Sequence, residues 1–304
     1  MEYTGLTRSY PVHRPLTSQE HDQQLRQRQK FDLEAAYQLS VIRTNSTYLE
    51  LVDKYYAWKG FISTGMLAGC AIVFWMLGAM TIYSLITPGR LATDWPYLAF
   101  LYVFAAPALV LCIWLIRKES FAYTHYPMRF NRKTRMVHVF RLDGTVLSVP
   151  WDDVFFCLAP AMQGLWNIRG HVLDADGRTV KETFSLPIVA GKSAGDRQVM
   201  LGFWEFVRSY MEEGPQQAAS LVKICLPIAE RRERPIDGFR RLHAEGSLNV
   251  FTSLAAAVIA IAIAPGRWFA IQTSKVPVWP REIEDRCRVN PDDRFSRDAS
   301  MNAM

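Results

Sequence analysis

The sequence predicts an α+β membrane protein, in which a transmembrane helical hairpin carries a small soluble domain of antiparallel strands closed by one helix. Two charge-free apolar runs, residues 61–86 and 95–116, each exceed or match the roughly 20 residues that cross a bilayer core. Residues 121–214 instead alternate apolar and polar side chains between turn sequences, which is typical of strands. A third apolar run, residues 248–265, predicts a further membrane helix.

Composition narrows the function only slightly. The net charge of +6 suits anionic lipid headgroups, nucleic acid or an acidic protein, without choosing among them. The five cysteines have no paired spacing, so we expect neither a disulfide framework nor a CxxC metal clip. The amino terminus lacks the apolar stretch of a cleavable signal peptide. The first apolar run is therefore expected to act as the insertion signal.

Residues 1–58 are predicted to form an extended arm followed by a polar helix. Thr17 and Glu20 have the spacing of a capping box, which places the start of that helix at Thr17 and its end near Arg43. Apolar side chains recur there at three- and four-residue steps, namely Phe31, Leu33, Ala36, Leu39 and Ile42. This narrow stripe favours a solvated helix docked on its neighbour; partner binding is the alternative.

Residues 59–117 are predicted to be the transmembrane hairpin, turned at Pro88-Gly89-Arg90. An aromatic cluster precedes the first span, where an interfacial belt is expected; its members are Tyr55, Tyr56 and Trp58. Lys and Arg residues flank the hairpin on both sides, whereas the turn carries only Arg90, opposed by Asp94. Together with the apolar runs, the positive-inside rule therefore predicts a multi-pass protein of an inner-membrane type with its soluble domain in the cytoplasm.

Residues 118–215 are predicted to form the soluble domain. Turns are expected at residues 131–134, Asp143-Gly144 and Asp176-Gly177. A closing helix is expected over residues 196–213, and its apolar face comprises Val199, Phe203, Phe206, Val207 and Tyr210. Antiparallel strands followed by one helix is the order of pleckstrin-homology-like (PH-like) barrels.

The remainder is expected to comprise a basic connector (216–247), the third membrane helix (248–265) and a polar tail (266–304). The third run is short and rich in alanine, so either a full span or a re-entrant helix fits it. The side of the membrane on which the tail lies depends on that choice.

Motifs for catalysis are not evident. The six histidines lack metal-site spacing, and no phosphate loop or nucleophile elbow occurs, so we expect no cofactor, no metal and no enzymatic activity. Asp152 and Asp153 have the arrangement of an acid–base pair, but capping of a turn explains them better. Neither hairpin run contains an ionisable residue, which argues against an ion pathway.

A basic stretch follows the hairpin. It contains Arg129, Arg132, Lys133 and Arg135. These side chains would reach anionic lipid headgroups if they lie at the membrane face, and we favour lipid over nucleic acid as their partner.

Four blocks in the soluble domain together resemble the DUF6708 family of bacterial membrane proteins. The blocks are RFNRKTR (129–135), VPWDD (149–153), RGHVLD (169–174) and WEFVRSYMEEGP (204–215). The resemblance covers residues 121–215, and the preceding hairpin fits the family's layout. Because members lie beside type VI secretion effector genes, the resemblance implies an immunity protein that binds and occludes a secreted toxin of the nuclease type.

An interface with such a toxin would use exposed aromatic, arginine and acidic side chains. The candidates are Trp151, Asp152, Asp153, Trp166, Arg169, Trp204 and Glu205. Tryptophan in a small barrel is more often a core residue, so the three tryptophans have that alternative. A structural or assembly factor of a secretion or envelope complex is the alternative function, and formation of a homo-oligomer is left open.

Overall fold

The structure is a computed structural model, and it describes residues 10–161, 164–246 and 250–302. The chain is mixed α/β with antiparallel sheets, and it divides into two compact units. The strand unit comprises residues 1–57, 123–233 and 276–304. The helix unit comprises residues 58–122 and 234–275.

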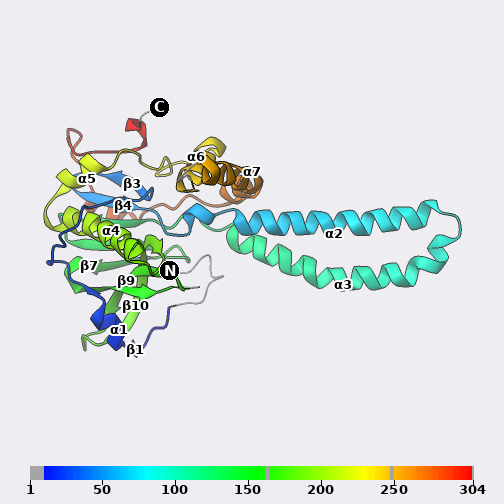
Figure 1. The fold of residues 1–304 in the computed structure, drawn as a ribbon, viewed down its shortest axis with the longest axis horizontal. Coiled ribbons are helices and arrows are strands. Elements are labelled where there is room, and N and C mark those ends of the chain that lie inside the picture. The colour runs from blue at the N-terminus through cyan, green and yellow to red at the C-terminus, as the bar shows by residue number, and fades with distance from the viewer. Residues whose placement is uncertain (1–9, 162–163, 247–249, 303–304) are drawn as a thin grey trace. The chain divides into compact units, whose positions relative to one another are not determined.

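The strand unit contains two five-stranded antiparallel sheets (Figure 1). Sheet A has the order β1-β10-β9-β8-β2, formed by β1 (Arg14–Pro15), β10 (Thr179–Ala190), β9 (Trp166–Leu173), β8 (Val154–Pro160) and β2 (Gln24–Leu25). Sheet B has the order β3-β4-β5-β6-β7, formed by β3 (Val41–Thr44), β4 (Tyr48–Leu51), β5 (Met128–Asn131), β6 (Met136–Phe140) and β7 (Val146–Pro150).

The three predicted turns are confirmed. β5 pairs with β6 across residues 132–135, and the Asn131 side chain accepts the Thr134 backbone N–H at 3.0 Å. β6 pairs with β7, and β9 with β10, around glycines with positive φ, Gly144 (86°) and Gly177 (64°). Glycine suits these positions because it adopts positive φ without the steric cost of a Cβ atom.

The predicted closing helix is α4 (Ala194–Glu212), which packs on sheet A. Ser193 caps it and forms a capping box with Asp196. Phe203 is fully buried in a core shared by both sheets, as expected, but Val199 is 46% exposed and lies outside the apolar face predicted for it. A short helix, α5 (Pro215–Leu221), follows directly.

The predicted polar helix of residues 17–43 is wrong beyond its first turns. Thr17 does form the capping box with Glu20, but α1 (Ser18–Asp22) is only five residues long. The chain then pairs with β8 through β2 and later enters sheet B as β3. Pairing with distant strands outweighs the weak local helical periodicity, and Val41, Ile42 and Thr44 are β-branched residues that favour strands.

The carboxy-terminal segment returns to the strand unit. Thr44 pairs with Arg297, and Trp279 and Ile283 pack with Tyr48 and Phe140 on sheet B. The remaining short elements of the strand unit are η2 (Trp151–Asp153), α8 (Arg281–Arg286) and η4 (Ala299–Met301). The strand unit therefore draws on three segments of the chain, where the sequence predicted one.

In the helix unit, α2 (Phe61–Ile86) and α3 (Arg90–Glu119) form the expected antiparallel hairpin, visible as two long helices in Figure 1. The short η1 (Tyr56–Trp58) precedes α2. The unit is completed by α6 (Pro235–Gly246) and α7 (Val250–Thr273).

The third apolar run therefore forms a helix that continues past its predicted end at Pro265. Residue 248, its predicted start, lies outside the described residues.

Candidate functional site

Three helices are long and apolar enough to cross a membrane. They are Tyr56–Ile86, Arg90–Glu119 and Ser253–Thr273. Only 6% of the apolar window of each hairpin helix is buried within the protein, against 33% for the third helix. Large apolar side chains therefore face outward along α2 and α3, and such a surface is expected to be covered by lipid.

Aromatic side chains are exposed at both ends of the hairpin, and others, such as Trp75 and Phe104, are exposed along its length. Trp58 and Phe61 are exposed at the start of α2, and Tyr83, Trp95 and Tyr97 are exposed near the turn. The helix rises about 33 Å between Phe61 and Tyr83, at about 1.5 Å per residue. This length is sufficient to cross a hydrocarbon core of about 30 Å.

A buried carboxylate fixes the open end of the hairpin. Glu119, which is fully buried, accepts the backbone N–H of Gly60 at 2.8 Å and of Ser63 at 2.6 Å, and so caps α2. The Lys59 ammonium donates to the Glu119 carbonyl at 2.9 Å, and Arg267 of α7 donates to the Lys59 carbonyl at 3.0 Å. All three helices thus meet in one hydrogen-bonded network.

The strand unit presents a charged cluster that we call the corner site, formed by Arg135, Trp151, Asp152, Trp204 and Glu212. The Arg135 guanidinium binds both Asp152 oxygens at 2.7 and 2.6 Å and a Glu212 oxygen at 2.8 Å. The same Glu212 oxygen accepts the indole N–H of Trp151 at 2.7 Å. Trp151 is fully buried and stacks on Trp204 with ring centres 5.7 Å apart.

In the corner site, the Asp152 side chain is exposed to solvent, whereas the stacked rings of Trp151 and Trp204 are buried. Hydrogen bonding from Arg135 lowers the pKa of Asp152, so this carboxylate is ionised at neutral pH. Asp153 beside it is exposed, as is Lys133 on the adjacent turn, while Arg132 is half-buried. Arg135 is held at a φ of 53°, which is uncommon for a residue with a side chain.

The other predicted interface residues lie elsewhere. Glu205 is buried and accepts two hydrogen bonds from Arg208, at 2.8 and 2.5 Å. It therefore stabilises α4 and is not available to a partner at the surface. Trp166 is half-buried at the start of β9. Arg169 binds the Asn167 side chain at 3.2 Å and lies over the Tyr10 ring at 4.7 Å. Of the predicted set, the corner site brings together only Trp151, Asp152 and Trp204, with Arg135 from the basic stretch.

Arg129, predicted to face lipid, is instead buried in the strand unit. Its guanidinium lies between the rings of Tyr48 and Trp279, at 4.6 and 4.8 Å from their centres. It pairs with Glu50 at 3.2 Å and with Glu284 at 3.0 Å. A buried arginine with two carboxylates and two aromatic faces attaches the carboxy-terminal segment to sheet B.

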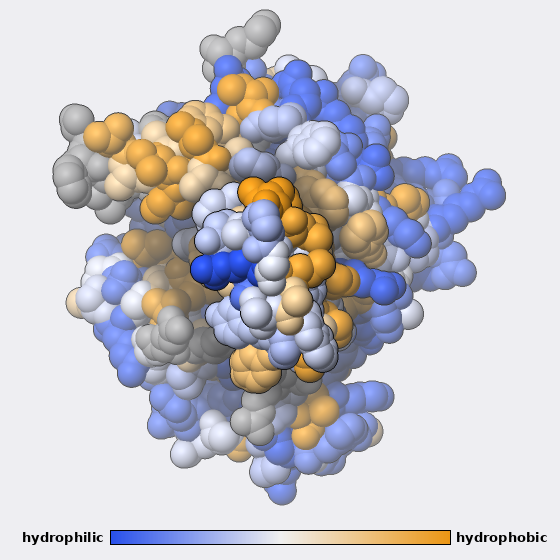
Figure 2. All heavy atoms as spheres, turned by 90° about the vertical axis from the view of Figure 1, so that its right-hand side faces the viewer, coloured by the Kyte–Doolittle hydropathy of each residue, from blue (hydrophilic) through white to orange (hydrophobic). Residues whose placement is uncertain are grey.

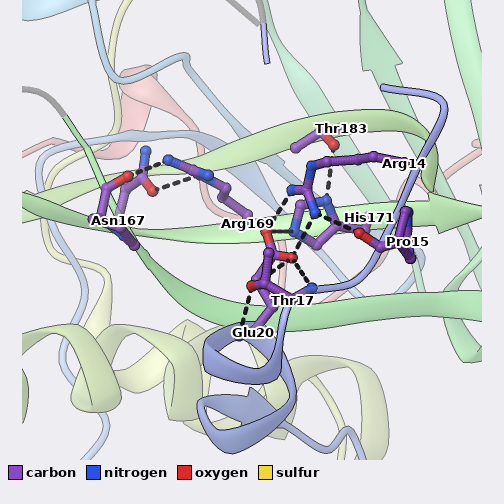
Figure 3. Close-up of polar contacts among 9 residues, drawn as sticks. Arg14, Pro15, Thr17, Glu20, Asn167, Arg169, His171 and Thr183 are labelled. Atoms are coloured by element: carbon purple, nitrogen blue, oxygen red, sulfur yellow. Dashed lines mark hydrogen bonds and ion pairs between the residues drawn. The ribbon is translucent and has the colours of Figure 1, made fainter. Parts of the chain in front are cut away.

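The sequence did not reveal a second buried polar cluster, which lies on the outer face of sheet A (Figure 3). Glu20 of α1 receives two hydrogen bonds from Arg14, at 2.8 and 2.6 Å, and one from the Thr17 backbone at 2.9 Å. His171 of β9 is fully buried; its Nδ1 lies 2.8 Å from the Thr183 hydroxyl. Its Nε2 lies 3.4 Å from Glu20, an electrostatic contact without hydrogen-bond geometry.

This cluster has the hydroxyl–imidazole–carboxylate order that activates nucleophiles. Its groups are buried beneath the amino-terminal segment, however, and they act as structural hydrogen-bond partners. Burial lowers the pKa of His171 to about 4, so the ring is neutral at pH 7. Burial would raise the pKa of Glu20, but hydrogen bonds from Arg14 and Thr17 outweigh it and lower the pKa to about 2. His171 on β9 lies opposite Thr183 on β10. The alternation of side chains along these two predicted strands is the only sequence signal that could have indicated this pair.

Metal chemistry has no donor set among the residues that the structure describes, because they hold no group of three or more His, Cys, Asp or Glu side chains able to bind an ion. The five cysteines are free, and burial raises the pKa of Cys157 and Cys225 to about 12, so both remain protonated thiols.

Comparison with known proteins shows the family. The model of DUF6708, a family of unknown function, matches residues 105–291, more than half of the chain. The chain belongs to the DUF6708 family. The matched part begins within α3 and ends after α8, so it includes the corner site as well as α7. No curated protein and no solved structure matches the chain.

Proposed function

We propose that this DUF6708 protein is anchored in the bacterial inner membrane by the α2–α3 hairpin, with its strand unit in the cytoplasm. Two aromatic ends about 33 Å apart and the outward-facing apolar side chains support a spanning hairpin. Six basic residues between Arg117 and Arg135, against the lone Arg90 in the turn, support the orientation. The order of antiparallel strands followed by the closing helix α4 supports a PH-like fold for the strand unit.

The proposed role is immunity: the strand unit binds a cognate type VI secretion toxin and neutralises it by occlusion. The observation that carries this proposal is the corner site, where exposed charges of both signs are held on a rigid, stacked tryptophan base. Charged side chains of fixed geometry give a partner specificity, and a buried aromatic base keeps them in place. Occlusion requires no active site.

Reporter fusions test the anchoring directly. A fusion after Arg90 is expected to report the periplasm, and fusions after Arg135 and after Asp153 the cytoplasm. If the fusions after Arg90 and Arg135 report the same side, the hairpin does not span and the anchoring proposal fails.

Capture of the toxin tests the role. Membranes containing the tagged full chain are expected to retain the cognate toxin, and Asp153→Lys is expected to weaken retention, because it reverses an exposed charge directly beside the corner site. Lys192→Glu, on the exposed loop before α4, is the matched charge-reversal control. Retention of structural subunits instead of a toxin would favour the alternative, an assembly factor.

A further inference from the structure

A cavity of about 360 Å³ lies between α2 and α3 beside the hairpin turn. Its polar and aromatic lining residues are Tyr83, Ser84, Arg90, Asp94 and Tyr97. This volume is in the range of sites that bind small polar groups. Figure 2, which looks along the hairpin onto its turn, shows one strongly hydrophilic patch among weakly polar and apolar side chains.

The charges in this cavity are only loosely paired. Asp94 accepts a hydrogen bond from the buried Ser84 hydroxyl at 2.9 Å, which fixes the carboxylate. Arg90 is half exposed, approaches Asp94 no closer than 4.0 Å, and lies over the Tyr83 ring at 5.4 Å. Within the described part of the chain its guanidinium donates no hydrogen bond, so its N–H groups remain available to an anion.

The cavity thus offers a cation for a phosphate and, one helical turn away, a fixed carboxylate with two phenol rings for an ammonium. Guanidinium binds phosphate through paired N–H groups, and carboxylate and aromatic faces bind ammonium. The apolar lining residues Ala79, Met80 and Leu98 lie further from the turn than Arg90, on the side where acyl chains would run. A zwitterionic headgroup lying along the membrane plane would supply a partner for each of these charges, whereas an anionic headgroup without an amine would bring its negative charge beside the Asp94 carboxylate.

We propose that this cavity binds the headgroup of an aminophospholipid, with the phosphate on Arg90 and the primary ammonium on Asp94. The inference rests on the proposed function only in that the hairpin spans, which places the turn at the level of the outer headgroups. The lipid would then fix the depth of the hairpin at its distal end.

Native mass spectrometry of the full chain in detergent tests the proposal with three lipids of identical acyl chains, bearing ethanolamine, glycerol or choline headgroups. We expect the ethanolamine lipid to bind roughly tenfold more tightly than the other two, as for one charge-assisted hydrogen bond. Asp94→Asn should remove that preference, Asp94→Glu should retain part of it, and Arg90→Gln should weaken binding of all three. Lys118→Gln, at the other end of α3, is the matched control and should change nothing.

Equal binding of the three lipids, or an unchanged preference in the Asp94→Asn variant, would overturn the proposal. So would soluble phosphoethanolamine that binds as tightly as the lipid, because the site would then not be a lipid site. The reporter fusions separate the two failures. Opposite sides after Arg90 and Arg135 without a lipid preference reject this inference alone, and the same side for both rejects the anchoring itself.

Discussion

His171 is a neutral, fully buried base whose pKa of about 4 lies below the ordinary value of about 6.5 for histidine. The unfolded chain therefore binds a proton at a higher pH than the folded chain does. Stability from this group is complete above pH 6.5 and is lost as the pH falls from 6.5 to 4. Burial likewise lowers the pKa of His138 to about 4, so the two histidines act in the same window.

We therefore expect the free energy of unfolding of the full chain in detergent to fall between pH 7 and pH 5. His171→Gln should reduce this fall to about half, because His138 still contributes. Glu20 does not interfere, since its pKa of about 2 makes its contribution fall only below about pH 4.5. Denaturation curves at the two pH values measure the effect, and a stability that rises on acidification would contradict the neutral, buried state of these rings.

Gly60 shows how one residue constrains a whole helix junction. Its φ is 94°, and a Cβ atom at this position would lie 2.2 Å from Arg267 Cα. We expect Gly60→Ala to destabilise the helix unit by roughly 1–3 kcal/mol or more, because the backbone strain and the overlap with α7 both oppose folding. Gly65→Ala is the matched control, since nothing lies within 4 Å of its Cβ position. Thermal unfolding in detergent should give a lower melting temperature for Gly60→Ala than for Gly65→Ala. Equal melting temperatures would contradict the close packing of Gly60 against Arg267.

At the scale of elements, α4 provides the main test of the core. Phe203→Ala should cost about 3–5 kcal/mol, because a fully buried ring is lost from the core shared by both sheets. Val199→Ala on the same helix should cost much less, since that side chain is 46% exposed. Chemical denaturation of the full chain gives both values. Similar losses for the two variants would mean that α4 does not pack on the sheets through Phe203.

The elements also show what the sequence could reveal. Turn pairs such as Asp143-Gly144 and the capping motif at Thr17 act locally, so the hairpins and the start of α1 were predictable. β4 pairs with β5, whose residues lie about 80 positions further along the chain, and β3 joins the sheet only through β4. No local pattern encodes the pairing of β4 with β5. For the same reason Arg129, in an apparently exposed basic stretch, is covered by the distant Trp279.

At the scale of the whole molecule, the strand unit is assembled from three segments. Leu25, Val41, Leu49 and Leu51 of the amino-terminal segment belong to the same core as Phe130 and Phe203. We therefore expect an isolated fragment of residues 118–215 to show no cooperative unfolding, although its own sequence predicts an independent domain. Circular dichroism during a urea titration decides this. A sharp two-state transition would mean that the terminal segments are dispensable.

The candidate site was predictable only in part, for a related reason. Trp151 and Asp152 were predicted as interface residues and Arg135 as a lipid-facing residue. The structure instead pairs Arg135 with Asp152, and Glu212 at the end of α4 joins Arg135 to Trp151. The buried Glu20–His171 cluster unites residues about 150 positions apart, because the amino-terminal segment folds onto sheet A.

The most direct test of membrane-anchored immunity is the dose dependence of protection. Cells that express the cognate toxin at a fixed level would receive increasing amounts of the full-length protein while growth is recorded. Occlusion predicts that protection appears near equimolar amounts, and that Asp153→Lys shifts the required dose upward by a factor corresponding to about 1–3 kcal/mol, which higher expression overcomes. Protection at strongly substoichiometric amounts, or no protection at any dose, would contradict it.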